Sequence, residues 1–110
     1  MKRILIICAA GMSSSLFAKK AGITLSSRGM DVEVEARCMT EGEDLIRKNS
    51  YDLYLVSPQA RVYIESFKKA AGKSGAVILE IPPASYVPIP AGFEKFSAFM
   101  EEQIKSLPLQ

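Results

Sequence analysis

The chain has 110 residues, which is enough for one domain and too few for two of ordinary size. Hydrophobic residues make up 48% and charged residues 24%, a globular composition that excludes disordered and collagen-like chains. The 14 Lys and Arg against 12 Asp and Glu leave a formal net charge of +2, which argues against a nucleic-acid or anionic-membrane binder. We therefore expect a single domain over residues 1–110 that neither binds nucleic acid nor inserts into a membrane.

Two residue types narrow the possible chemistry. The sequence contains no His, which excludes His-containing catalytic triads and most zinc sites. Its two cysteines, Cys8 and Cys38, are too few for the disulfide framework of a small secreted protein, and their spacing fits no zinc motif. We predict neither a metal nor a cofactor.

The first predicted element is a buried strand over residues 4–7, which are all apolar. Lys2 and Arg3 before the apolar run 4–10 resemble the start of a signal peptide, but the segment is too short for one. It is also too short to span a bilayer, which takes about 20 residues. We interpret it as a strand covered on both faces, and the chain as cytoplasmic.

A helix and a second strand follow. Residues 13–27 have a helical apolar period, and Arg28-Gly29 supply a stop. The residues predicted to form its buried face are Leu16, Phe17, Ala21, Thr24 and Leu25. Residues 32–38 alternate apolar and charged, which predicts an edge strand. Cys38 is predicted to continue the inward, core-facing series, and a redox pairing with Cys8 is the alternative.

The second half repeats the alternation of helix and strand. Thr40 and Glu43 match a capping box for a helix over 41–48, and residues 53–56 predict a second interior strand. A helix over 60–71, closed by Gly72, has a predicted inner face of Ala60, Tyr63, Ile64, Phe67 and Ala71. Residues 76–81 predict the fourth strand, and a Pro-rich connector follows over 82–90. The last helix turns these residues inward: Phe93, Phe96, Met100, Ile104 and Leu107.

The predicted fold is α/β, a four-stranded parallel sheet in the order 2-1-3-4 with helices on both faces, because right-handed crossovers join the alternating elements. In this order the winding reverses between the first and third strands. Ligands bind such sheets at the carboxyl ends of the strands beside the reversal. Two segments meet there, residues 8–15 and 57–59.

The segment 8–15 has the composition of an anion-binding turn. Cys8 ends the strand, small residues allow a tight turn, and serines open the helix. The predicted phosphate-binding residues are Ala9, Ala10, Gly11, Met12, Ser13, Ser14 and Ser15. The positive end of the helix dipole should favour the thiolate of Cys8, the nucleophilic form, and this suggests a phosphocysteine. The alternative is that Cys8 is a small core residue and the serines only cap a helix.

Two other functions compete with a phosphoryl carrier. Cysteine phosphatases and arsenate-reductase-like enzymes use a similar turn, but a phosphatase needs Arg at the sixth position after the nucleophile, where this chain has Ser14. No Arg or Lys occurs between Arg3 and Lys19, so the machinery for hydrolysis is missing and a carrier fits better. A regulator that senses phosphate or redox state through Cys8, without transferring a phosphoryl group, is the third possibility.

The segment from Cys8 to Ser15 resembles the phosphorylation loop of the lactose/cellobiose-type enzyme IIB components of the bacterial phosphoenolpyruvate-dependent sugar phosphotransferase system. Pro58-Gln59 match a second recurring element of that family, and Tyr86, the chain length and the element order also agree. Ser14 stands where Thr is usual, and residues 87–90 depart from the family pattern.

The resemblance implies the fold predicted above and a phosphotransferase activity. Cys8 would accept a phosphoryl group from a histidine of the IIA component and pass it to a sugar entering through the membrane component IIC. The backbone of residues 9–15 would hold the phosphoryl oxygens. Pro58 and Gln59 are possible secondary site residues, and Gln59 either faces the phosphoryl group or caps the third helix.

Overall fold

The computed structural model describes residues 2–8, 12–72, 75–85 and 89–106. Four parallel strands form one sheet in the order β2-β1-β3-β4, as predicted. The strands are β1 (Lys2–Cys8), β2 (Val32–Cys38), β3 (Leu53–Val56) and β4 (Ile78–Glu80). The α-helices are α1 (Met12–Ser27), α2 (Met39–Lys48), α3 (Ile64–Ala71) and α4 (Pro90–Lys105). Two 3₁₀ helices, η1 (Pro58–Tyr63) and η2 (Pro83–Ser85), follow β3 and β4.

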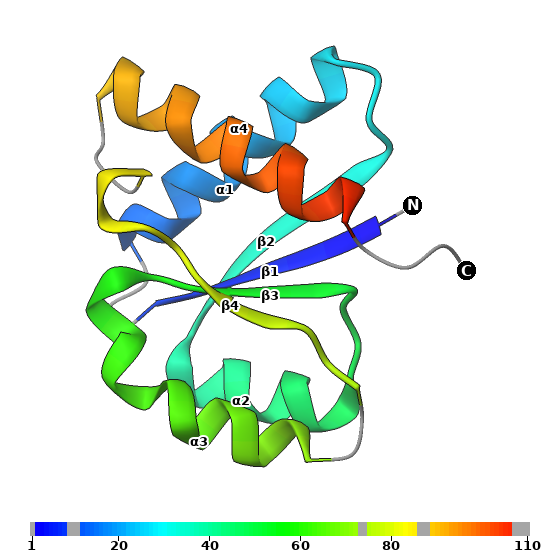
Figure 1. Cartoon of the computed structure of the whole chain (residues 1–110), viewed down its shortest axis with the longest axis vertical. Coiled ribbons are helices and arrows are strands. Elements are labelled where there is room, and N and C mark those ends of the chain that lie inside the picture. Colours follow the sequence, from blue (N-terminus) through cyan, green and yellow to red (C-terminus); the bar gives the residue numbers. More distant parts are fainter. Residues whose placement is uncertain (1, 9–11, 73–74, 86–88, 107–110) are drawn as a thin grey trace.

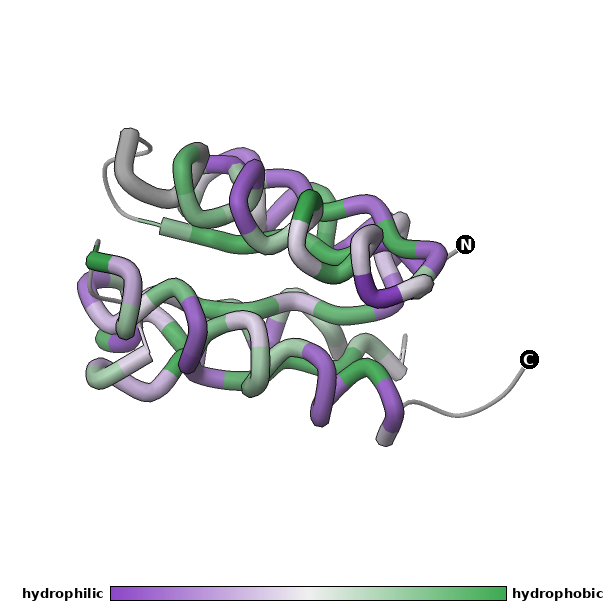
Figure 2. The backbone as a smooth tube through the Cα atoms, turned by 90° about the horizontal axis from the view of Figure 1, so that it is seen from above, coloured by the Kyte–Doolittle hydropathy of each residue, from purple (hydrophilic) through white to green (hydrophobic). Residues whose placement is uncertain are grey.

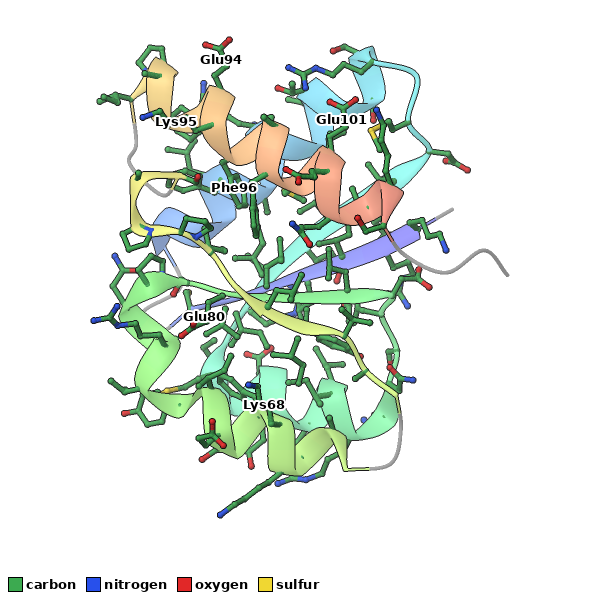
Figure 3. All side chains as sticks on the ribbon, in the orientation of Figure 1. Lys68, Glu80, Glu94, Lys95, Phe96 and Glu101 are labelled. Carbon is green, nitrogen blue, oxygen red and sulfur yellow. The ribbon has the colours of Figure 1, made fainter. Side chains whose placement is uncertain are left out.

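Helices cover both faces of the sheet (Figure 1). Helices α1 and α4 lie on one face, and α2 and α3 lie on the other. Hydrophilic and hydrophobic segments alternate along the helical coils in Figure 2, as expected for helices with one buried face. In α4, Phe96 points toward the sheet and Glu94 points away from it (Figure 3).

Strand β1 lies at the centre of two hydrophobic cores. Ile4 and Ile6 pack into the core under α1 and α4, whereas Leu5 and Ile7 pack into the core over α2 and α3. All four side chains are fully buried, because each face of the strand is covered. The apolar run over residues 4–7 therefore forms a strand that is buried on both faces, as predicted.

Two predicted buried faces need correction. Leu16 is 43% exposed, because the buried face of α1 is formed by Phe17, Ala18, Ala21 and Leu25 and Leu16 lies outside that stripe. Tyr63 is 41% exposed, because Pro58 starts a 3₁₀ helix that changes to α-helix only at Ile64. The single helix predicted over 60–71 is therefore wrong in its first turn. Leu107 lies outside the described residues.

The capping box predicted at Thr40 is also wrong. Helix α2 begins at Met39, directly after β2, and its N-cap is Cys38 with extended backbone (φ −73°, ψ 166°). Cys38 pairs with Cys8 across the sheet, so the strand continues to the first residue of the helix. Thr40 lies inside the first turn and its side chain caps nothing.

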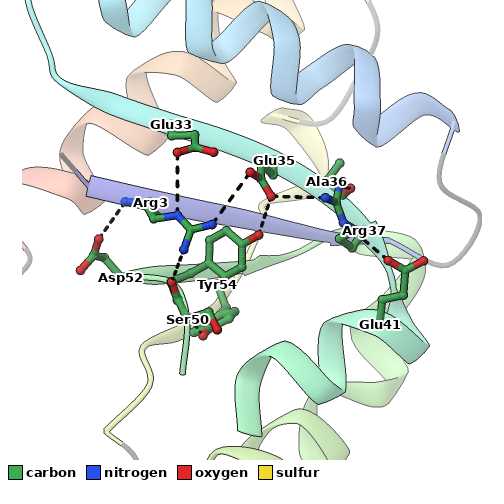
Figure 4. Close-up of polar contacts among 10 residues, drawn as sticks. Arg3, Glu33, Glu35, Ala36, Arg37, Glu41, Ser50, Asp52 and Tyr54 are labelled. Atoms are coloured by element: carbon green, nitrogen blue, oxygen red, sulfur yellow. Dashed lines mark hydrogen bonds and ion pairs between the residues drawn. The ribbon is translucent and has the colours of Figure 1, made fainter. Parts of the chain in front are cut away.

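The charged side of β2 forms a polar network at the sheet edge. The Arg3 guanidinium lies 3.8 Å from Glu33, 4.0 Å from Glu35 and 4.4 Å from the centre of the Tyr51 ring, and it donates to the Ser50 carbonyl (Figure 4). Tyr51 donates its hydroxyl hydrogen bond to Glu35. The charged face of this edge strand therefore forms ion pairs with Arg3 and a hydrogen bond with Tyr51.

Two glycines provide a matched test of packing against β1. A Cβ on Gly42 of α2 would lie 2.9–3.0 Å from three carbons of Ile7, whereas a Cβ on Gly22 of α1 would meet nothing within 4 Å. Overpacking costs about 1–3 kcal/mol, more than the roughly 1 kcal/mol by which Ala is preferred to Gly in a helix. We expect Gly42→Ala to lower the free energy of unfolding in urea and Gly22→Ala to raise it. A stabilising Gly42→Ala would contradict this packing.

The surroundings of the Tyr51 phenol should make the protein less stable at alkaline pH. Burial, and next the hydrogen bond to Glu35, raise the pKa of Tyr51 to about 12 from its ordinary value of 10.0. As the pH rises, the unfolded chain therefore loses this proton before the folded chain does. The contribution of Tyr51 to the free energy of unfolding is complete below pH 10 and is lost as the pH rises toward 12.

We expect Tyr51→Phe to reduce the fall in unfolding free energy between about pH 10 and 12, measured by urea unfolding at each pH. Part of the fall should remain, because burial also raises the pKa of Tyr54. An alkaline slope unchanged by Tyr51→Phe would show that this phenol is not the titrating group.

Candidate functional site

The candidate site lies where the two central strands, β1 and β3, reach their carboxyl ends. We call this end of the sheet the carboxyl edge. Cys8 is the last residue of β1, and Val56 is the last residue of β3. The chain winds from β1 to one side of the sheet and from β3 to the other, so the reversal falls between these two strands. The structure therefore brings the segments that begin at residues 8 and 57 to the same edge, as predicted.

Cys8 is nearly enclosed at this edge. Its exposed fraction is 4%, and it lies between β2 and β3 in the sheet. Helix α1 begins at Met12 and has 16 residues, with no acidic side chain in its first turn. The N-terminus of such a helix attracts an anion, because its first N–H groups lack helical partners and its dipole end is positive.

The described ranges include only some of the predicted phosphate-binding residues. Ala9, Ala10 and Gly11 lie outside the described residues, as does Tyr86. The backbone of Met12, Ser13, Ser14 and Ser15 forms the first turn of α1, which follows Cys8 in the chain after three residues. The cradle itself therefore stays a prediction.

Pro58 and Gln59 form the first turn of η1, directly after β3. Pro58 occupies the first helical position, where its missing N–H costs nothing. Gln59 is exposed and does not cap the helix, because the N-cap residues of η1 and α3 are Ser57 and Tyr63 and neither uses a side-chain cap. The capping role considered for Gln59 is wrong, and its role toward a phosphoryl group stays a prediction.

Ser57 belongs to the segment 57–59 that the sequence places at this edge, but the state of its side chain is seen only in the structure. It is fully buried, and its Oγ has no hydrogen-bond partner in the described part of the chain. The only signal in the sequence is a polar residue directly after the apolar strand 53–56.

Cys38 occupies the same edge on the other side of Cys8 but does not join the core. It is half-buried, and its sulfur lies 3.4 Å from Thr40 Oγ1 and 3.7 Å from Glu41 Oε1. The hydrogen bond with the Thr40 hydroxyl, followed by one from the backbone at Glu41, lowers the pKa of the Cys38 thiol. The predicted core role is therefore wrong, because Cys38 is the last residue of the strand and the cap of α2.

The surface around this edge has exposed apolar side chains and a groove lined by one basic and one acidic residue, Arg61 and Glu80. Leu16, Val62, Tyr63 and Ile89 are exposed, and they belong to α1, η1 and the residue before α4. Helices α1 and α4 both begin at this edge (Figure 1). Arg61 and Pro58 line an open groove of about 240 Å³ beside β4.

The described part of the chain has neither a metal-binding cluster nor a membrane-spanning helix. No group of His, Cys, Asp and Glu residues there is arranged to hold a metal ion. No helix among the described residues is long and apolar enough to cross a membrane.

Comparison with known proteins agrees with this geometry. A model of the family described as "PTS system, Lactose/Cellobiose specific IIB subunit" matches residues 3–92. The fold is similar to that of the lactose-specific IIB component domain of the phosphoenolpyruvate:carbohydrate phosphotransferase system from Streptococcus pneumoniae. That comparison has a TM-score of 0.76 and 22% sequence identity, and it covers 92% of this chain and 95% of the other. Among curated proteins, none matches this chain.

The family match spans most of the chain and includes the strand that ends at Cys8, the start of α1 and the turn after β3. The chain belongs to the family of lactose/cellobiose-specific IIB subunits of the sugar phosphotransferase system.

Proposed function

We propose that this chain is a phosphoryl carrier in which Cys8 receives a phosphoryl group from a phosphohistidine of a IIA component and transfers it to a sugar held by a IIC component. The observation that carries the proposal is the position of Cys8. It is the last residue of the central strand, at the reversal of the winding, and a 16-residue helix begins just after it in the chain. The family of the chain supports the same role.

The reaction needs only one nucleophile from this chain. In the first step the Cys8 sulfur attacks phosphorus, the P–N bond to the donor histidine breaks, and the thiol proton is transferred to the imidazole nitrogen. In the second step a sugar hydroxyl oxygen attacks phosphorus, and the S–P bond breaks with its electron pair returning to sulfur. The sulfur takes up one proton in place of the one that the sugar hydroxyl releases, so the thiol form is restored.

The proposed cradle consists of backbone N–H groups and the dipole of α1 rather than a cationic side chain. No Arg or Lys occurs between Arg3 and Lys19, and the first turn of α1 holds no acidic residue. Oriented N–H groups stabilise a phosphoryl group through the transfer, in which its charge is spread over three oxygens. Without a fixed cation, the group is held less tightly and can be passed on.

The same features favour a carrier over a hydrolase. Ser14 stands where a cysteine phosphatase has the Arg that clamps phosphate. A carrier must keep its phosphoryl group until the acceptor arrives, so the absence of this Arg suits that role.

The exposed apolar residues around this edge are the surface we propose for the partners. Leu16, Val62, Tyr63 and Ile89 are exposed on the segments nearest the carboxyl edge. Donor and acceptor must both reach the Cys8 sulfur, so IIA and IIC are expected to use this surface in turn. Exposed apolar groups with a polar surround are typical of such interfaces.

The two cysteines provide the decisive comparison. After incubation with phosphoenolpyruvate, the two general phosphocarriers and a cognate IIA, we expect wild type and Cys38→Ser to gain one phosphoryl group and Cys8→Ser to gain none. Cys38 is the matched control because it is the sheet neighbour of Cys8 and carries the same thiol. Intact mass spectrometry measures the gain.

The outcome separates the three functions considered. Loss of the gained mass on addition of IIC and sugar supports the carrier, whereas retention supports a regulator. Turnover of an aryl phosphate by the isolated protein would support a phosphatase. If Cys38→Ser, and not Cys8→Ser, abolished labelling, the assignment of the nucleophile would be wrong.

A further inference from the structure

Ser57 lies next to Cys8 in the sheet. Ile7 of β1 pairs with Val56 of β3, and the Ser57 N–H donates to the Ile7 carbonyl at 2.9 Å. The next residues along the chain are therefore Cys8 at the end of β1 and Ser57 directly after β3. Neighbouring strands lie about 4.8 Å apart, so the two residues are within side-chain reach of each other.

Both side chains belong to the same face of the sheet. Ile4 and Ile6 of β1, and Leu53 and Leu55 of β3, pack into the core under α1 and α4. Side chains alternate along a strand, and the backbone of Ser57 is still extended (φ −65°, ψ 156°). The alternation therefore directs Cys8 and Ser57 toward the side of the sheet on which α1 begins.

The Ser57 hydroxyl is unsatisfied in the thiol form of the protein. The residue is fully buried, and its Oγ is the one buried side-chain oxygen or nitrogen without a hydrogen-bond partner in the described part of the chain. A buried hydroxyl that lacks a partner is destabilising, whereas Ala at the same place would carry no such penalty. An acceptor that arrives during the reaction would relieve it.

We propose that Ser57 binds the phosphoryl group, its Oγ–H donating a hydrogen bond to a phosphoryl oxygen of the phosphocysteine at Cys8. This inference rests on the carrier function proposed above. The S–P bond extends from the Cys8 sulfur, and the group has three oxygens that are strong acceptors. Ser57 has an unused donor on the adjacent strand, on the same face.

The proposed hydrogen bond would make Ser57 favour the phosphorylated form of the protein over the thiol form. In the thiol form Ser57 destabilises the fold, and in the phosphorylated form its hydrogen bond stabilises the modified protein. Hydrogen bonds to charged acceptors are stronger than those between neutral groups. Ser57 would therefore raise the equilibrium occupancy of Cys8 without altering the nucleophile.

Ser57→Ala tests the inference with two readouts, of which only the first should fall. In mixtures with phosphorylated IIA, we expect the equilibrium constant for phosphoryl transfer to the variant to fall about tenfold, measured by intact mass. In the thiol form, we expect the midpoint of urea unfolding to stay unchanged or rise, because the unsatisfied hydroxyl is gone. A residue with a purely structural role would not produce this combination.

Ser97→Ala is the matched control, since Ser97 is a buried serine of α4 outside the candidate site. It should leave the transfer equilibrium at the wild-type value. If Ser57→Ala takes up phosphoryl groups as wild type does, or lowers the unfolding midpoint of the thiol form, the inference is overturned and the carrier function stands. If wild type is not phosphorylated by a mixture that phosphorylates a reference IIB, the proposed function fails, and this inference with it.

Discussion

The burial of β1 on both faces is the constraint on which the rest of the structure depends. Ile4, Leu5, Ile6 and Ile7 are all inaccessible to solvent, two on each side of the sheet. A strand with two apolar faces is stable only with a helical layer on each side and a strand along each edge. These requirements place β1 in the middle of the sheet and its last residue, Cys8, at a protected edge.

Polar groups of different kinds lie along the β2 side of the sheet and at its carboxyl edge. Ion pairs among Arg3, Glu33 and Glu35 lie along the half-buried side of β2, where Tyr51 adds a hydrogen bond and a ring contact. The carboxyl edge instead has thiols, a buried hydroxyl and the N-terminus of α1. Neutral donors and a helix dipole hold an anion less strongly than a buried ion pair does, which is consistent with the proposed role as a phosphoryl carrier.

Two errors of the sequence interpretation concern the residue at which a helix begins. Thr40 matches a capping box, but β2 remains paired with β1 up to Cys38, so the helix begins one residue earlier. Tyr63 matches a helical apolar period, but Pro58 imposes a tighter 3₁₀ turn before the α-helix starts. In both places strand pairing or proline geometry decides where a helix begins, and the periodicity of apolar residues does not report either effect.

The sequence by itself determined the alternation of strands and helices, the order of the sheet and the position of Cys8 at the reversal of its winding. These depend on local periodicity and on the handedness of crossovers, which neighbouring residues carry. Only the tertiary structure decided that Cys38 and Cys8, at the ends of β2 and β1, and Ser57, directly after β3, occupy adjacent positions. That register is set by contacts between distant segments, such as the two hydrogen bonds that join Arg3 to Asp52, 49 positions later. An unsatisfied hydroxyl is likewise a property of what surrounds it, so no local pattern could reveal that the Ser57 hydroxyl lacks a partner.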